Sequence, residues 1–215
     1  GRGSRFASES GEPLPKVLRP VLGRPMVCHV LDTLDDAGVE HVVVVVGFGA
    51  EAVKNAVGEG VRYVTQPEQK GSGHAAACAR EAFAGFDGQL VVMCGDSPLF
   101  TCATLAAMMA EHASLEAAVT LAAAVLDDPT GYGRILRDRS GGVSGIAEER
   151  CASAEQKALR EVNGGAYVFD CRWLFDNIDK MVVNEAGEYN LTDMVRVAIE
   201  QGRVVASVRC DPTEL

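Results

Sequence analysis

Hydrophobic residues in the first half of the chain alternate between two spacings. Residues 25–37 carry apolar side chains three and four positions apart after Pro25, and Gly38 follows them, which predicts an amphipathic helix with a defined end. Residues 41–47 contain five consecutive valines, a pattern typical of a parallel strand buried on both faces. The same reasoning predicts helices at 50–57, 73–83 and 101–112 (with Thr101 as N-cap), and strands at 61–64 and 90–94.

This alternation of strands and helices predicts an α/β fold with a Rossmann-like, doubly wound and mostly parallel sheet. Ligands in such sheets bind beyond the carboxyl ends of the strands. After residue 117 the pattern changes to several strands with few helices between them, so we expect a smaller mixed β extension beside the cleft. Its predicted strands are 117–124, 133–136, 142–147, 162–169 and 204–208, with a helix at 190–200.

Composition narrows the class of protein. The 215 residues fit one α/β domain, and 47% hydrophobic with 23% charged residues is ordinary for a globular protein. The formal net charge of -10 argues against non-specific binding to nucleic acid, because few cations are available to neutralise phosphates. A small anionic substrate fits better, provided that a local group of Lys, Arg and backbone N–H groups binds it.

Cysteine usage favours a reducing compartment. The seven cysteines are odd in number, contain no C-x-x-C pair and have no histidines at metal-binding spacing, so we expect neither disulfides nor a zinc site. No run of about 18 apolar residues predicts a membrane span. No signal peptide is visible either, and we expect a cytoplasmic protein without membrane partners.

Two basic segments near the start are candidates for binding phosphate. Residues 1–5 form a loop in which Gly1 and Gly3 permit close backbone approach and Arg5 can donate two hydrogen bonds to phosphate oxygens. Lys16 lies between proline-stiffened stretches and suits a triphosphate or a sugar phosphate. Taken alone, a terminal tail and a solvated surface lysine are the favoured explanations, whereas Lys16 together with the Gly-rich loop upstream favours a phosphate site.

Two later segments add recognition and metal chemistry. Gln66 presents an amide that can pair with a base edge, and residues 71–73 place N–H groups at a helix start. Gly95 and Asp96 end an apolar strand, where a carboxylate beside phosphates is a natural Mg²⁺ ligand. A glycine-rich helix start and an Asx-type turn are the structural alternatives, and spacing does not decide between them.

The order of these motifs resembles the bacterial N-acetylglucosamine-1-phosphate uridyltransferases, a branch of the sugar nucleotidyltransferases. The resemblance covers the whole chain, and its later motifs are the more specific to this branch. In sequence order the matching motifs are G-x-G-(S/T)-R, P-K-V-L, L-x-G-(R/K)-P-M, Q-x-E-Q-x-G-(S/T)-G-H-A, G-D-x-P-L, D-D-P-x-G-Y-G-R-I, G-I-x-E, E-x-N-x-G and G-E-Y-x-L-T-D.

The resemblance implies a nucleotide-diphospho-sugar transferase fold and a Mg²⁺-dependent reaction. UTP and GlcNAc-1-phosphate would give UDP-GlcNAc and pyrophosphate for cell-wall precursor synthesis. Arg5, Lys16 and Asp96 would be catalytic, with Asp96 binding Mg²⁺. The substrate-binding residues would be Gly1, Gly3, Lys16, Gln66, Gly71, Ser72, Cys94, Gly95 and Asp96 on the nucleotide side, with Gly133, Glu148 and Asn163 around the sugar.

The chain departs from the family at its ends. It begins in a loop that normally follows a buried strand, and it ends at Leu215, before the Asn that the family uses as a second metal ligand. We therefore expect residues 1–215 to be a single nucleotidyltransferase domain truncated at both ends. The family's β-helix acetyltransferase domain has no counterpart in these residues, and oligomers would form only through it. Another sugar-1-phosphate nucleotidyltransferase, or a silent domain that binds sugar nucleotide, stays open.

Overall fold

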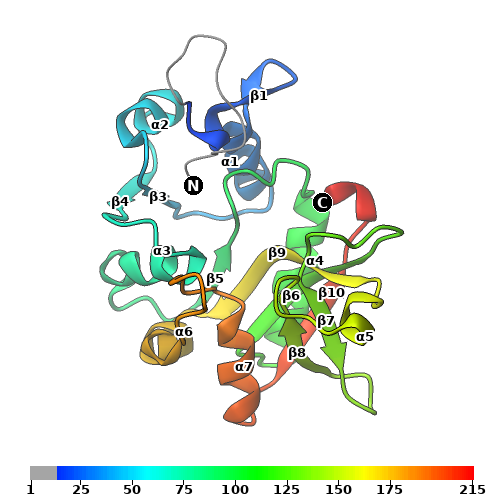
Figure 1. The fold of residues 1–215 in the computed structure, drawn as a ribbon. Helices are drawn as coiled ribbons and strands as arrows, with labels where there is room; N and C mark the ends of the chain where they lie inside the picture. Colours follow the sequence, from blue (N-terminus) through cyan, green and yellow to red (C-terminus); the bar gives the residue numbers. More distant parts are fainter. Residues whose placement is uncertain (1–13) are drawn as a thin grey trace.

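A computed structural model describes residues 14–215 of the chain, and Figure 1 shows its layout. The strands are β1 Pro20–Val21, β2 Arg24–Pro25, β3 Val43–Val46, β4 Arg62–Thr65, β5 Gln89–Val92, β6 Val119–Val125, β7 Arg134–Arg137, β8 Val143–Ala147, β9 Glu161–Asp170 and β10 Val205–Arg209. The α-helices are α1 Met26–Asp36, α2 Ala50–Val57, α3 Ser72–Cys78, α4 Cys102–Ser114, α5 Ala154–Lys157, α6 Cys171–Asn177 and α7 Asp193–Glu200. Short 3-10 helices lie at η1 Lys16–Leu18, η2 Arg80–Phe83, η3 Ile178–Lys180 and η4 Pro212–Glu214.

The larger sheet has six strands and is mixed. Its order is β10-β6-β9-β7-β8, and β5 also pairs with β9. The strand pairs β10–β6 and β3–β4 are parallel, whereas β9 runs antiparallel to both β5 and β6. In Figure 1 the β3–β4 pair lies with α1 and α2 on one side of the molecule, and the six-stranded sheet occupies the other.

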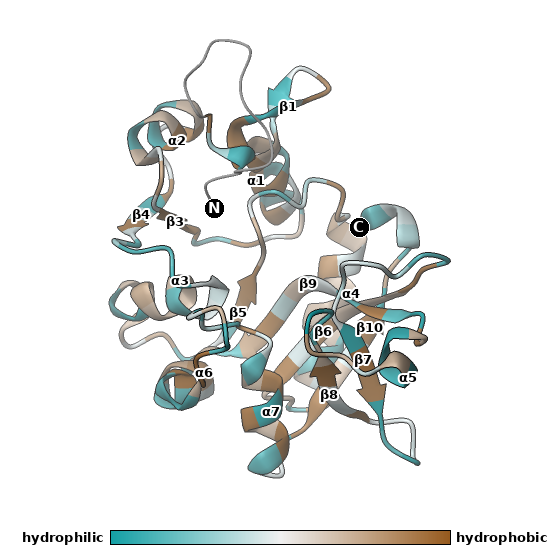
Figure 2. Cartoon of the chain, viewed as in Figure 1, coloured by the Kyte–Doolittle hydropathy of each residue, from teal (hydrophilic) through white to brown (hydrophobic). Residues whose placement is uncertain are grey.

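Helices cover both faces of the six-stranded sheet. Leu121, Tyr167 and Phe169 point to the face packed by α6 and α7, while Ala122 and Val168 point to the face packed by α1 and α4. Neighbouring residues of one strand point to opposite faces, so a strand covered on both sides is apolar throughout. Figure 2 accordingly shows hydrophobic colouring along much of this sheet and hydrophilic colouring on many loops at its rim.

Most predicted elements are confirmed within a few residues. Gly38 ends α1 with a positive φ of 79° and donates its N–H to the carbonyl of Asp35, as the helix-stop signal predicted. Thr101 caps α4, since its hydroxyl oxygen accepts the N–H of Thr104 at 3.2 Å. Because these positions depend on local chemistry, the sequence pattern located them well.

Four helices differ from the expected pattern, among them the short α5, which was not predicted. The predicted helix at 73–83 divides into α3 and η2, because the chain tightens to 3-10 geometry beyond Ala79. The helix expected from residue 190 begins at Asp193, after a turn closed by Asn190. Helix α6 was not predicted, although Asp170 caps it by accepting the N–H of Trp173 at 2.9 Å.

No helix within residues 14–215 is long and apolar enough to cross a membrane. All seven cysteines are free, and Cys171 and Cys210 are buried.

Candidate active site

A cavity of about 1160 Å³ lies where the segments following β4 and β5 come together. Apolar side chains from β3 and β5 line much of it, and polar groups gather along the rest. Seven of the predicted nucleotide-side residues line this cavity: Lys16, Gln66, Gly71, Ser72, Cys94, Gly95 and Asp96. The position agrees with the rule that ligands bind beyond the carboxyl ends of strands in α/β folds.

Lys16 and Asp96 form an ion pair in this cavity. The ammonium Nζ of Lys16, in η1, lies 2.7 Å from Oδ2 of Asp96, which follows β5, and both side chains remain partly exposed. A glycine at position 95 lets η1 approach, because a Cβ there would lie 3.3 Å from Cγ1 of Val17. A cation and a carboxylate from distant parts of the sequence are thus held beside one another.

The segment from Gln66 to Ser72 is fixed by hydrogen bonds. Gln66 donates from Nε2 to the carbonyl of Gly71 at 3.1 Å. Gly71 has a φ of 97°, and a Cβ there would lie 2.4 Å from the carbonyl oxygen of Tyr189, so only glycine fits. The hydroxyl of Ser72 accepts the N–H of Leu191 at 3.0 Å, and it does not cap α3.

The three predicted sugar-side residues are also neighbours. The N–H of Asn163 donates to the carbonyl of Gly133 at 2.8 Å. A Cβ on Gly133 would lie 3.6 Å from Oε2 of Glu148 and 3.0 Å from Cγ2 of Ile146. The glycine at 133 therefore lets the start of β7 lie close to the end of β8, beside Glu148.

Tyr167 lies between the two groups of residues. Its hydroxyl accepts a hydrogen bond from Nδ2 of Asn163 at 2.6 Å, and its side chain lines the large cavity. Burial raises the pKa of Tyr167, and the nearby Cys94 and Glu148 contribute in the same direction. The phenol therefore stays neutral and links the sugar-side amide to the nucleotide-side cavity.

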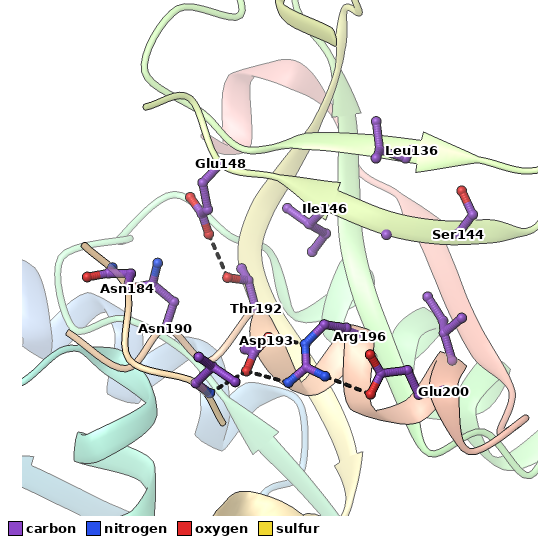
Figure 3. Close-up of a pocket in the computed structure, with 13 residues that line it drawn as sticks. Leu136, Ser144, Ile146, Glu148, Asn184, Asn190, Thr192, Asp193, Arg196 and Glu200 are labelled. Atoms are coloured by element: carbon purple, nitrogen blue, oxygen red, sulfur yellow. Dashed lines mark hydrogen bonds and ion pairs between the residues drawn. The ribbon is translucent and has the colours of Figure 1, made fainter. Parts of the chain in front are cut away.

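Glu148 lies at the edge of a second, smaller cavity of about 330 Å³ between β8 and α7 (Figure 3). Oε1 of Glu148 accepts a hydrogen bond from the hydroxyl of Thr192 at 2.5 Å. Arg196 at this cavity is held by Asp193 and Glu200, at 2.7 Å and 2.6 Å. The hydroxyl of Thr192 thus fixes one oxygen of the Glu148 carboxylate at the edge of this cavity.

The side chains of the described residues supply only part of the ligand shell that Mg²⁺ needs. Within residues 14–215 no group of three or more His, Cys, Asp or Glu side chains is arranged to bind a metal ion. Mg²⁺ commonly takes one or two carboxylates and completes its shell with phosphate oxygens and water. Asp96 supplies one carboxylate of this kind to the large cavity.

Some predicted site residues cannot be compared with the structure, and others were missed. Gly1, Gly3 and Arg5 lie outside the described residues. Tyr167 and Thr192, which hold Asn163 and Glu148, were not predicted. Thr192 stands inside the E-Y-x-L-T-D motif, and Tyr167 lies four residues after Asn163 on the same strand; these were the available signals.

Comparison with known proteins defines the class. Residues 1–167 match the MobA-like NTP transferase domain, which together with this fold makes the chain a nucleotidyltransferase. The chain belongs to the MobA-like NTP transferase domain family. It is 47% identical over 96% of its length to the bifunctional protein GlmU of Exiguobacterium sp., and 45% identical over 96% to that of Heliobacterium modesticaldum. It spans 45% and 44% of those two proteins, so under half of each.

A solved structure supports the fold. A protein from Bacillus anthracis, assigned as a glucose-1-phosphate thymidylyltransferase and in complex with sucrose, superposes with a TM-score of 0.80. The match covers 98% of this chain and 83% of that one at 21% sequence identity. The predicted α/β nucleotide-diphospho-sugar transferase fold is thereby confirmed.

Proposed function

We propose that this domain converts UTP and GlcNAc-1-phosphate to UDP-GlcNAc and pyrophosphate with the help of Mg²⁺. The observation that carries the proposal is the Lys16–Asp96 ion pair in the cavity that Gln66 also lines. Phosphate chemistry needs a cation and a metal-binding carboxylate at one point, and base recognition needs a polar group nearby. The relatives named GlmU support this choice.

The reaction needs no nucleophilic side chain. A phosphate oxygen of GlcNAc-1-phosphate attacks the α-phosphorus of UTP, and pyrophosphate leaves opposite to it with the electron pair of the broken P–O bond. Lys16 neutralises phosphate charge that grows in the transition state, and Arg5 is proposed for the same role. Asp96 would hold the Mg²⁺, whose chemistry would be further neutralisation of phosphate charge.

The remaining residues orient the two substrates. Gln66, Gly71, Ser72, Cys94 and Gly95 hold the nucleotide in this proposal, with Gly1 and Gly3 close to its phosphates. Gly133, Glu148 and Asn163 contact the hydroxyls and the N-acetyl group of the sugar. Holding both reactants in line removes much of the entropy cost of a bimolecular step. The product would feed cell-wall precursor synthesis in the cytoplasm, where reduced thiols are stable.

Pyrophosphate release tests this proposal. The assay compares UTP with CTP, ATP, GTP and dTTP, and GlcNAc-1-phosphate with glucose-1-phosphate, in the presence of Mg²⁺. We expect release from UTP with GlcNAc-1-phosphate and at least about 100-fold less in the Asp96→Ala variant. Preference for glucose-1-phosphate or dTTP would replace the proposed substrates, and binding of UDP-GlcNAc without release would indicate a silent binding domain.

A further inference from the structure

The orientation of the Gln66 side-chain amide is fixed by its neighbours. The carbonyl of Gly71 can only accept a hydrogen bond, so the atom 3.1 Å from it must be the amide nitrogen Nε2. The same nitrogen lies 3.0 Å from Nδ1 of His74, in α3. Nδ1 must therefore accept, which places the ring proton on Nε2 of a neutral imidazole.

The opposite side of the imidazole agrees with this tautomer. Nε2 of His74 lies 3.9 Å from Sγ of Cys78, one helical turn further along α3, and a thiol sulfur is a weak acceptor for its N–H. Both hydrogens of the Gln66 amide are thus engaged, one by Gly71 and one by His74. Within residues 14–215, Oε1 of Gln66 has no hydrogen-bond partner, and the side chain lines the large cavity.

We propose that His74 is a positioning residue that sets the base selectivity of the site by holding Gln66 with Oε1 toward the ligand. This inference rests on the proposed function and adds how the site selects the base of the nucleotide. An outward acceptor favours a base with a ring N–H, such as N3–H of uracil. Cytosine presents a ring-nitrogen acceptor at the same position, so two acceptors would face one another and the amide could not respond by rotating.

Rotation of the amide is what His74 prevents. Turning Gln66 over would bring Oε1 against the Gly71 carbonyl and against Nδ1 of His74, both of which are acceptors. Without the imidazole only the Gly71 contact opposes the rotation, so a cytosine could be met by the amide NH₂. One neutral hydrogen bond of this kind changes the preference by about 3- to 10-fold.

Matched variants at position 74 test the proposal. His74→Leu removes the acceptor at similar bulk, and His74→Asn can place its Oδ1 close to the position of Nδ1. We measure kcat/KM with UTP and CTP, and the affinities for UDP and CDP by calorimetry. The expected result is a uracil-to-cytosine ratio that falls about 3- to 10-fold in His74→Leu and recovers in His74→Asn. The kcat with UTP should stay within about two-fold in both variants, since His74 contacts no reacting atom.

Several outcomes separate the hypotheses. An unchanged UDP-to-CDP affinity ratio in a folded His74→Leu protein overturns the role of His74, and so does an equal loss in His74→Asn. A wild-type protein that binds UDP and CDP equally also overturns it. A wild-type protein that prefers UDP but releases no pyrophosphate refutes the transfer reaction alone, and the binding ratios still decide on His74.

Discussion

The ammonium of Lys16 lies 2.7 Å from the carboxylate of Asp96, although one residue belongs to η1 and the other follows β5. The pair places opposite charges side by side in the cavity. In the proposed reaction, a nucleotide arriving with Mg²⁺ would offer phosphate to the lysine and a metal to the carboxylate, so the pair would exchange one set of partners for another.

Replacing either member of this pair should stop catalysis but leave the fold intact. We expect Lys16→Ala and Asp96→Ala each to lower kcat/KM at least about 100-fold, since each removes charge stabilisation from the transition state. The melting temperature should hardly change, because partly exposed ion pairs add at most about 1 kcal/mol. Lys54→Ala, which breaks the exposed Lys54–Glu51 pair on α2, is the matched control and should keep full activity. Near-normal turnover in either site variant would refute its assigned role.

The reaction should depend on Mg²⁺, and replacing Asp96 should raise the Mg²⁺ concentration that it needs. Chelation with EDTA should abolish pyrophosphate release, and added Mg²⁺ should restore it. In Asp96→Asn the carboxylate is lost at unchanged size, so the Mg²⁺ concentration for half-maximal rate should rise about tenfold or more. A titration of rate against Mg²⁺ measures this, and an unchanged midpoint would mean that Asp96 does not bind the metal.

Tyr167 should act on sugar binding through Asn163. Tyr167→Phe removes the oxygen that accepts from Nδ2 of Asn163, so that amide keeps the hydrogen bond from the N–H of Gly165 to its Oδ1 but loses the one at Nδ2. We expect KM for GlcNAc-1-phosphate to rise about 3- to 10-fold, with KM for UTP little changed. Tyr63→Phe removes a phenol that donates to the carbonyl of Gly58 outside the site, and it should alter neither constant. An equal rise in both KM values would point to a general structural effect.

Thr192 should support Glu148 in the same way. Thr192→Val keeps the shape but removes the hydroxyl that donates to Oε1 of Glu148 at 2.5 Å. Hydrogen bonds to charged groups contribute about 1.5–3 kcal/mol, so KM for the sugar phosphate should rise roughly tenfold or more. Thr213→Val, in which an exposed hydroxyl near Asp211 is lost, serves as the control. An unchanged KM for the sugar phosphate in Thr192→Val would show that Thr192 does not position Glu148 for sugar binding.

Two buried thiols predict how stability depends on alkaline pH. Burial raises the pKa of Cys171 and of Cys210 to about 11, from an ordinary value of 9.0. The folded state therefore holds these protons longer than the unfolded state, so the associated stability is complete below pH 9 and is lost as pH rises through about 11. Denaturant unfolding at several pH values should show a shallower loss in Cys171→Ala/Cys210→Ala. Cys102→Ala/Cys151→Ala changes exposed thiols and should keep the wild-type slope, and equal slopes in all three proteins would contradict the prediction.

Sequence patterns located the site residues better than they located the contacts between them. Lys16, Gln66 and Asp96 stand in motifs whose local chemistry is visible, and all three line one cavity. The antiparallel pairing of β5 with β9 joins residues far apart in the chain, which no local pattern encodes. The contact of Thr192 with Glu148 likewise joins residues far apart in the chain, and that of Tyr167 with Asn163 forms within β9, so both appeared only in the folded chain.

The segment from Tyr189 to Thr192 touches both halves of the site. The N–H of Tyr189 donates to Lys70 and its carbonyl accepts from Gly73, each at 2.8 Å, while Thr192 reaches Glu148 on the sugar side. In the proposed reaction, a substrate that shifts one end of this segment would also shift the other. Thermodynamic linkage makes such an effect reciprocal: if the nucleotide strengthens sugar-phosphate binding by some factor, the sugar phosphate must strengthen nucleotide binding equally. Four residues of backbone would then give a two-substrate enzyme cooperativity within a single domain.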